Sequence, residues 1–142
     1  MIEKVIESWH QLLRGEYPSG LDGLLADDVV FYSPVVFTPQ QGKELAKLYL
    51  GAAGGVFGNA SSGQGQSSGG GLQYTRQIMS GDSAMLEFEA TMQGKYVNGV
   101  DIIRCNAEGK IAEFKVLLRP LQAVNLVHQQ MQAMLEKMKS RS

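Results

Sequence analysis

Apolar residues recur at steps of three and four at both ends of the chain, the spacing that buries one face of an α-helix. The first such segment stops at Gly15 and Pro18, and its apolar positions are Ile2, Val5, Ile6, Trp9, Leu12 and Leu13. The last one, over residues 120–139, carries Leu121, Val124, Val127, Met131, Leu135 and Met138. We therefore predict a helix at each end, and each needs a surface to cover its apolar stripe.

Shorter elements follow the first helix. The pattern predicts a short helix over 21–25 with Ser19 as N-cap, a strand over 29–33, and a helix over 40–53. Residues 54–71 are rich in glycine and serine, a composition that buries no core, so we expect a mobile surface loop there.

After this tract the pattern changes to period two, which indicates strands over 72–79, 84–92, 97–105 and 111–118. Ser80 to Ser83, Gln93-Gly94 and Asn98-Gly99 are turn or bulge signals. Helices followed by a meander predict an α+β fold, in which a curved, antiparallel or mixed sheet wraps around the N-terminal helices and a further helix ends the chain.

Composition indicates one small domain over residues 1–142. The chain is 44% hydrophobic, with a formal net charge of −1 and an isoelectric point near 6.1. Its basic residues are scattered, so neither nucleic acid nor an anionic membrane is an expected partner. No apolar run approaches the ~20 residues of a membrane span. A lone cysteine and the absence of a signal-like start favour a cytoplasmic protein.

Asp101 is the residue that calls for a chemical explanation. Alternation places it on the same face as Ile103 and Cys105, toward the interior. A buried carboxyl group must find hydrogen-bond partners or keep its proton. It could face a pocket, or it could accept hydrogen bonds from Trp9 or from the backbone near Asn98-Gly99.

Three segments within about the first 120 residues carry a family resemblance. They are 24–31, which begins Leu24-Leu25-Ala26-Asp27-Asp28; 34–42, which begins at Pro34; and 101–115, which begins at Asp101 and contains the turn Glu108-Gly109-Lys110-Ile111. Their order resembles the nuclear-transport-factor-2-like superfamily, and more narrowly its SnoaL-like and ketosteroid-isomerase-like members. The resemblance implies a cone-shaped, cystatin-like domain with a deep apolar pocket, commonly paired into a homodimer through the convex face of its sheet.

The resemblance transfers only part of the isomerase machinery. In the ketosteroid isomerases a tyrosine and a protonated aspartic acid hold the enolate oxygen while a second aspartate moves the proton. The sheet acid is matched by Asp101, but the tyrosine position falls on Trp9 and the base position on Ser33, whose hydroxyl has no useful basicity near neutral pH.

Two other branches of the superfamily use acids differently. The limonene-epoxide-hydrolase-like enzymes use an Asp-Arg-Asp group. In this chain Gly99 stands where that group has its arginine, and Val116 stands near the facing position on the next strand. The SnoaL-like cyclases need only an internal acid, which Asp101 could supply.

Three hypotheses about function remain open. The protein binds a small, mostly apolar molecule anchored by Asp101; or Asp101 is the acid or base of an isomerase, cyclase or hydrolase; or the domain is a dimerisation module whose interior is filled by its own side chains. Besides Asp101, the predicted pocket residues are Trp9, Phe31, Ser33, Tyr49, Phe88, Ile103, Phe114, Val116 and Leu118.

Other residues leave smaller choices. Tyr32, Tyr49 and Tyr74 could line the pocket mouth or fill the core. His10 is expected at the surface and His128 at a packing edge; no ligand-spaced partners accompany them, so neither a metal nor a cofactor is expected. We expect the last helix to pack across the dimer, or else to fold back over the pocket entrance.

Overall fold

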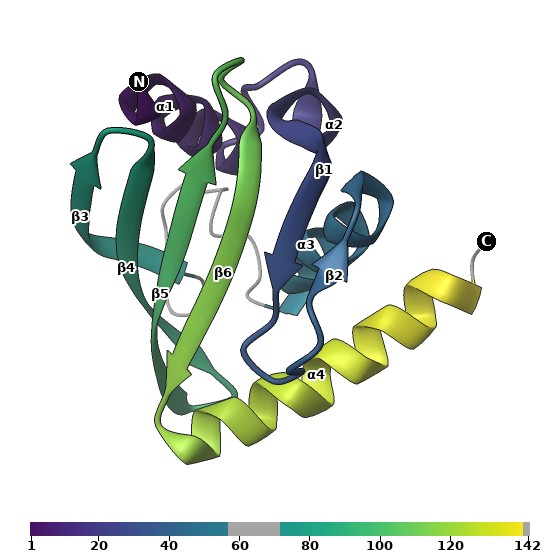
Figure 1. The fold of residues 1–142 in the computed structure, drawn as a ribbon. Helices are drawn as coiled ribbons and strands as arrows, with labels where there is room; N and C mark the ends of the chain where they lie inside the picture. The colour runs from purple at the N-terminus through teal and green to yellow at the C-terminus, as the bar shows by residue number, and fades with distance from the viewer. Residues whose placement is uncertain (57–71, 141–142) are drawn as a thin grey trace.

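A computed structural model describes residues 1–56 and 72–140 of the chain (Figure 1). Its helices are α1 (Ile2–Leu13), α2 (Gly20–Leu24), α3 (Lys43–Val56) and α4 (Leu121–Ser140). Its strands are β1 (Leu25–Tyr32), β2 (Gln40–Gln41), β3 (Leu72–Ser80), β4 (Ser83–Met92), β5 (Lys95–Cys105) and β6 (Ile111–Arg119). Helix α3 thus runs into the predicted glycine- and serine-rich loop, and residues 57–71 of that loop lie outside the described residues.

The described strands form one sheet of six, in the order β2-β1-β6-β5-β4-β3. The pair β1 and β6 is parallel and every other pair is antiparallel, so the sheet is mixed. Figure 1 shows a strongly curved sheet with α1 and α3 on one side, which we call the inner face, and we call the opposite side the outer face. The predicted α+β architecture is confirmed.

Two element boundaries near the N-terminus were predicted wrongly. Leu25, expected to end the second helix, begins β1, and Ser19 makes no side-chain hydrogen bond as a cap. Residues 40 and 41, expected to begin the third helix, form β2 and pair with Val30 and Phe31. Gly42 separates strand from helix, because its φ of 100° is a conformation that other residues rarely adopt.

The Asn98-Gly99 signal was also wrong, because both residues lie inside β5. The predicted turn at Gln93-Gly94 is confirmed, and the φ angles of these residues, 52° and 79°, suit a two-residue hairpin. Asn98 is buried on the outer face, where its Nδ2 donates to the Phe88 carbonyl at 2.9 Å. Gly99 is required by packing, since a Cβ there would lie 2.7 Å from the carbonyl oxygen of Leu117.

Two apolar cores fill the inner side. The first lies beneath α1 and includes Trp9, Phe31, Ile103 and Phe114. The second lies beneath α4. Tyr49 of α3 packs against both cores and so connects them.

Helix α4 covers the second core with its own buried face. Val127 and Met131 pack with Val97 of the sheet, and α4 also lies against α3. This part of the helix folds back on its own domain, and whether the rest of its apolar stripe packs across a dimer or covers a pocket entrance stays a prediction. Leu121, predicted on the buried stripe, is 73% exposed, because the inward face at this end is formed by Ala123.

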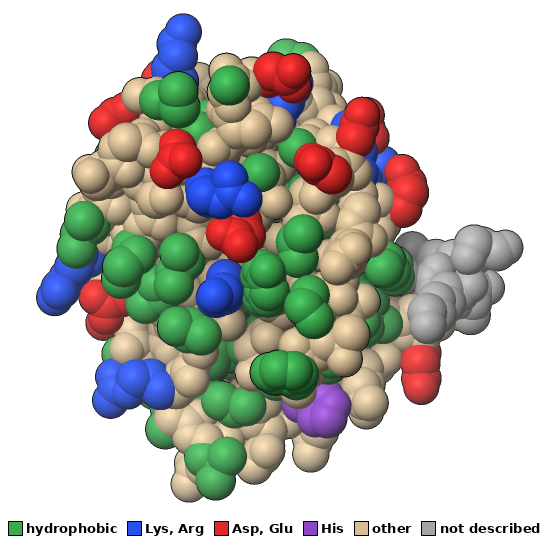
Figure 2. Space-filling model, viewed as in Figure 1, with side chains coloured by type: hydrophobic (Ala, Val, Ile, Leu, Met, Phe, Trp, Pro, Cys, Tyr) green, Lys and Arg blue, Asp and Glu red, His purple; other side chains and the backbone are tan. Residues whose placement is uncertain are grey.

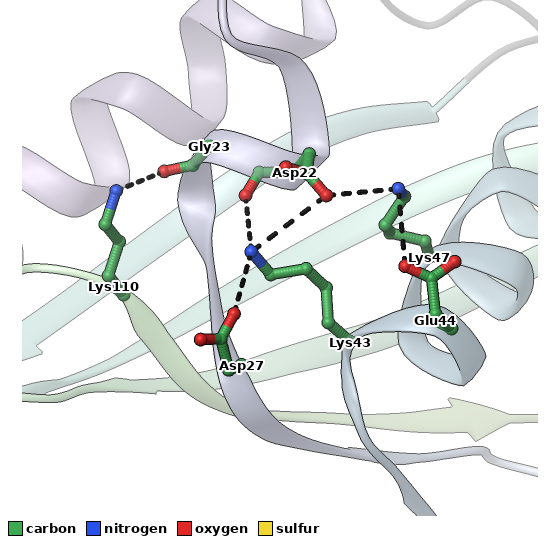
Figure 3. Close-up of polar contacts among 7 residues, drawn as sticks. All are labelled: Asp22, Gly23, Asp27, Lys43, Glu44, Lys47 and Lys110. Carbon is green, nitrogen blue, oxygen red and sulfur yellow. Dashed lines mark hydrogen bonds and ion pairs between the residues drawn. The ribbon is translucent and has the colours of Figure 1, made fainter.

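Charged residues join α2 to its neighbours (Figure 3). Lys43 Nζ donates to the Asp22 carbonyl at 2.9 Å and lies 3.2 Å from Asp27 Oδ1. Lys110 Nζ donates to the Gly23 carbonyl. These contacts attach a five-residue helix, too short to be stable alone, to α3 and to the turn before β6.

None of the helices in the described part of the chain is long and apolar enough to cross a lipid bilayer.

Candidate functional site

The site begins with the alternation of β5. Val97, Gly99, Asp101, Ile103 and Cys105 are buried, and the strand's pleat places all five on the inner face. Asp101 is 5% exposed, and the predicted shared face with Ile103 and Cys105 is confirmed. Leu86 of β4 and Val116 of β6 flank it across the sheet, so Val116 does take the predicted facing position.

Asp101 is the last group of a hydrogen-bond chain that begins on α1. Trp9 Nε1 donates to the Tyr74 hydroxyl at 3.0 Å, and that hydroxyl donates to Asp101 Oδ2 at 2.6 Å. The direction of the first bond is fixed because an indole N–H can only donate, and that of the second is fixed in the charged state because a carboxylate can only accept. We call this set the Trp9–Tyr74–Asp101 chain.

The expected direct partners of Asp101 were therefore wrong. Among the described residues, neither Trp9 nor the backbone near Gly99 donates to the carboxyl group, and Tyr74 does so instead. Trp9 takes part only through the tyrosine. Tyr74 was expected to line the pocket mouth or to fill the core, and neither expectation included this hydrogen bond.

Register explains how Tyr74 reaches a residue two strands away. Tyr74 pairs with Phe88 on β4, and Phe88 pairs with Gly99 on β5. A Cβ at residue 99 would collide with the Phe88 ring, so the glycine lets that ring lie against β5. The Tyr74 ring meets Phe88 edge-on, with centroids 6.1 Å apart, and its hydroxyl extends toward Asp101. The sequence feature that could have indicated this contact was Gly99, two residues before Asp101.

Burial changes the acid–base behaviour of both groups. Removal from water raises the pKa of Asp101 from 3.8 to about 7, and the Tyr74 hydrogen bond partly opposes this change. The pKa of Tyr74 is raised well above its ordinary value, first by burial and then by the charge on Asp101. Asp101 can therefore be either a neutral donor or a charged acceptor near neutral pH.

The second carboxyl oxygen of Asp101 differs from the first. No described residue hydrogen-bonds to Oδ1, whereas Oδ2 accepts from Tyr74. Buried polar atoms are nearly always hydrogen-bonded in folded proteins. Oδ1 is the atom of this site that needs a partner.

The two histidines lie differently from one another. His10 is half-buried: its ring is edge-on to Tyr74 with centroids 5.4 Å apart, and its Nε2 lies 2.6 Å from Gln77 Oε1. His128 is exposed on α4 rather than at a packing edge. In the described ranges, no three His, Cys, Asp or Glu side chains come together as metal ligands would.

Several other predicted pocket residues gather on the same side. Aromatic rings connect α1, β1, β6 and α3, with centroid distances of 5.0 Å for Trp9 and Phe114 and 5.7 Å for Phe31 and Tyr49. Val116 packs against the α1 core and Leu118 against the α4 core. Ile103 and Phe88 are buried on the same face. Their role as a ligand lining stays a prediction.

Ser33, at the position of the isomerase base, has a structural role in this fold. Its Oγ accepts a hydrogen bond from the Val35 backbone N–H at 3.1 Å, in the turn that follows β1. A hydroxyl that closes such a turn stabilises backbone geometry. It supplies no base.

Neither a protein-family model nor a curated protein matches this sequence, but solved structures do. A steroid delta-isomerase from Pseudomonas aeruginosa is 28% identical with a TM-score of 0.84, over 98% of this chain and 94% of that one. An uncharacterised protein with a cystatin-like fold from Silicibacter pomeroyi is 27% identical with a TM-score of 0.75, over 91% and 83%. A protein of unknown function from Mesorhizobium loti, 18% identical with a TM-score of 0.63 over 84% and 91%, is described as nuclear-transport-factor-2-like.

The chain has a nuclear-transport-factor-2-like fold. Solved structures with this fold include a "putative isomerase of the SnoaL-like family" and a "putative ketosteroid isomerase", so the predicted resemblance is confirmed at the level of fold. Many such structures belong to proteins of unknown function. Function in this nuclear-transport-factor-2-like chain must therefore be argued from its own residues.

Proposed function

We propose that the protein binds a small, mostly apolar molecule whose one polar group meets Asp101. The observation that carries this proposal is the buried Oδ1 atom, which has no hydrogen-bond partner among the described residues, beside an Oδ2 atom that has one. The residues around Asp101 are apolar, with Leu86 and Val116 on the flanking strands. Such surroundings favour a ligand with little polarity beyond the anchored group.

The acid–base state of Asp101 defines the polar group. Below its pKa of about 7 the neutral acid can donate to a carbonyl oxygen, and above it the carboxylate can accept from a hydroxyl. The similar Pseudomonas aeruginosa protein is a steroid delta-isomerase. Fused-ring ketones and the matching alcohols are therefore the first probes, with the parent hydrocarbons as controls.

The binding test can use the fluorescence of Trp9, the single tryptophan of the chain. We expect a ketone to change that emission in a saturable way at pH 6, and its hydrocarbon to bind at least ten-fold more weakly. Asp101→Leu should weaken ketone binding by about ten-fold, or about 1.4 kcal/mol. Asp82→Asn, which removes an exposed carboxylate, is the matched control and should bind as the wild type does.

The binding proposal fails if no probe in the panel binds. It also fails if Asp101→Leu binds the ketone as tightly as the wild type. The first result would favour an interior filled by the protein's own side chains, and the second would show that ketone binding does not depend on Asp101.

A second candidate, acid–base catalysis, is favoured by the pKa of about 7 for Asp101. Since Ser33 is no base, Asp101 would have to act alone. Its carboxylate would take a proton from the carbon beside a ketone, leaving an enolate, and the resulting acid would return the proton to another carbon of the same molecule.

Turnover distinguishes catalysis from binding. For an enzyme, deuterium from heavy water should enter an unsaturated ketone, at a rate that rises with pH through about 7 because the carboxylate is the active form. Asp101→Asn should abolish this exchange while ketone binding persists, because the amide can still donate. Exchange that survives in Asp101→Asn, or is never seen, would rule out this role.

We also propose that two copies associate through the outer face. Ile78, on β3, is 54% exposed and Leu117, on β6, is 52% exposed, and Met85 and Ile102 lie on the same face. Figure 2 shows hydrophobic side chains gathered over β5 and β6 on the side turned to the viewer. Exposed apolar patches of this kind commonly mark protein interfaces.

Oligomeric state tests this association. We expect a dimer by light scattering, and a monomer for Leu117→Lys. Leu45→Lys, at a 41% exposed leucine of α3, is the control and should stay dimeric. A monomeric wild type, or a dimeric Leu117→Lys, would contradict the proposal.

A further inference from the structure

We infer that Tyr74, held in place by Trp9, is a positioning residue for Asp101: it occupies one carboxyl oxygen and leaves the other to the ligand. This inference rests on the proposed binding function and extends it. It assigns roles to a residue of β3 and a residue of α1 through the Trp9–Tyr74–Asp101 chain.

The direction of the hydrogen bonds carries the first step. Trp9 Nε1 cannot accept, so the Tyr74 oxygen must accept from it at 3.0 Å. In the part of the chain that the structure describes, Asp101 Oδ2, at 2.6 Å, is the acceptor for the tyrosine hydrogen. Because the charged carboxylate can only accept, the Tyr74 hydrogen points to Oδ2 while the Tyr74 oxygen accepts from α1.

The second step concerns the proton of Asp101 in its neutral state. While Tyr74 donates to Oδ2, a proton on that oxygen would place two hydrogens within the 2.6 Å contact, so in this arrangement the neutral acid carries its proton on Oδ1. A ligand therefore meets one oxygen of defined polarity rather than a carboxyl group free to rotate. Fixing a polar group before the ligand arrives reduces the ordering cost of binding.

Other polar groups near the carboxyl do not take this role. The flanking positions on β4 and β6 are Leu86 and Val116, which carry no charge. His10 of α1 contacts Tyr74 by its ring and is bonded to Gln77, not to the acid. Tyr49 of α3 stacks on Phe31, on the same inner side. Within the described residues, Tyr74 is the titratable side chain bonded to Asp101.

The experiment is a carboxyl carbon-13 NMR titration of Asp101 in ligand-free protein. We expect Tyr74→Phe to raise the pKa of Asp101 by about one pH unit, because the carboxylate loses the hydrogen bond from Tyr74 while the ring remains in place. Trp9→Phe should raise it by less, since Tyr74 then becomes a weaker and less fixed donor. Tyr17→Phe is the matched control: it removes the hydroxyl of another partly buried tyrosine of the α1 core and should leave the titration unchanged.

The outcomes separate this inference from the proposed function. If Asp101 has the same pKa in Tyr74→Phe as in the wild type, the positioning role is overturned. This holds whatever the ligand assays show, because no ligand is present in the titration. An equal change in Tyr17→Phe also overturns it, since the effect would then be general to the core. The Trp9 variant replaces a buried residue, so Tyr74→Phe decides the matter if Trp9→Phe does not fold. Failure of every ligand probe on wild-type protein would overturn the binding proposal in a separate experiment.

Discussion

Replacement of Asp101 by asparagine should make the protein more stable at pH 8 and leave its stability nearly unchanged at pH 4. Asparagine keeps the shape of the side chain and an oxygen that can accept from Tyr74, but it cannot ionise. In the wild type the folded pKa of about 7 lies above the ordinary value of 3.8. The folded state therefore binds more protons than the unfolded state between these values, and stability falls as pH rises through this window.

The size of the effect follows from the same difference. A pKa raised from 3.8 to about 7 corresponds to about 4 kcal/mol of stability that is present at low pH and lost above pH 7. This is a large fraction of the 5–15 kcal/mol that typically separates folded from unfolded domains. Asp101 is almost wholly buried, so solvent screening does not reduce the effect as it would at the surface.

Urea unfolding followed by Trp9 fluorescence measures this effect. Wild type, Asp101→Asn and the exposed-site control Asp82→Asn are compared from pH 4 to pH 8 at one protein concentration, because association would also change stability. Taking the difference between variants removes the contribution of groups that titrate alike in both. We expect the Asp101→Asn curve to rise relative to the wild type by about 4 kcal/mol across this range, and the control to stay parallel. A constant difference between Asp101→Asn and the wild type would refute a carboxyl group whose burial raises its pKa.

Five further substitutions test the packing and one ion pair by the same unfolding assay. Gly99→Ala should lower the free energy of unfolding by about 3 kcal/mol, because the new Cβ would lie 2.7 Å from the Leu117 carbonyl oxygen. Gly94→Ala has open space around its Cβ but a positive φ, so it should lower the free energy of unfolding by about 1 kcal/mol. Equal losses would refute packing as the reason for Gly99. Val127→Ala should lower the free energy of unfolding by about 2 kcal/mol, and Leu121→Ala, at an exposed position, should leave it almost unchanged. The reverse order would contradict the packing of α4 seen here. Lys43→Met should lower the free energy of unfolding by at most about 1 kcal/mol, and high salt should remove this difference from the wild type. A difference that does not depend on salt would contradict ion pairing by Lys43.

The sequence predicted elements well where the information is local. The step of three and four in α1, and the alternation in β4, each depend on residues close in the chain, and both elements were found within a residue or two. Asn98-Gly99 was misread because the dipeptide is common in hairpin turns. Its actual roles depend on contacts with two neighbouring strands, which a single sequence does not specify.

The candidate site was predicted in part for the same reason. Alternation alone placed Asp101 on the inner face, and this was right. Its partner Tyr74 could not be assigned, because the contact spans 27 residues and depends on the register of two strand pairs. That register includes an irregularity between Tyr74 and Arg76, where one extra residue keeps Arg76 opposite Glu87 on the outer face.

The position of Asp101 along β5 connects the anchor to the rest of the interior. On that strand Val97 belongs to the core under α4 and Ile103 to the core under α1, with Asp101 between them. Four residues of strand span about 13 Å, so a molecule anchored at Asp101 could extend toward the α4 core without leaving the inner face. In the proposed function the Trp9–Tyr74–Asp101 chain would then select the polar group, and residues of α4 such as Val127 would select the length of the apolar part. Because these two groups of residues lie on different elements and share no hydrogen bond in the described structure, substitutions in each should change binding independently.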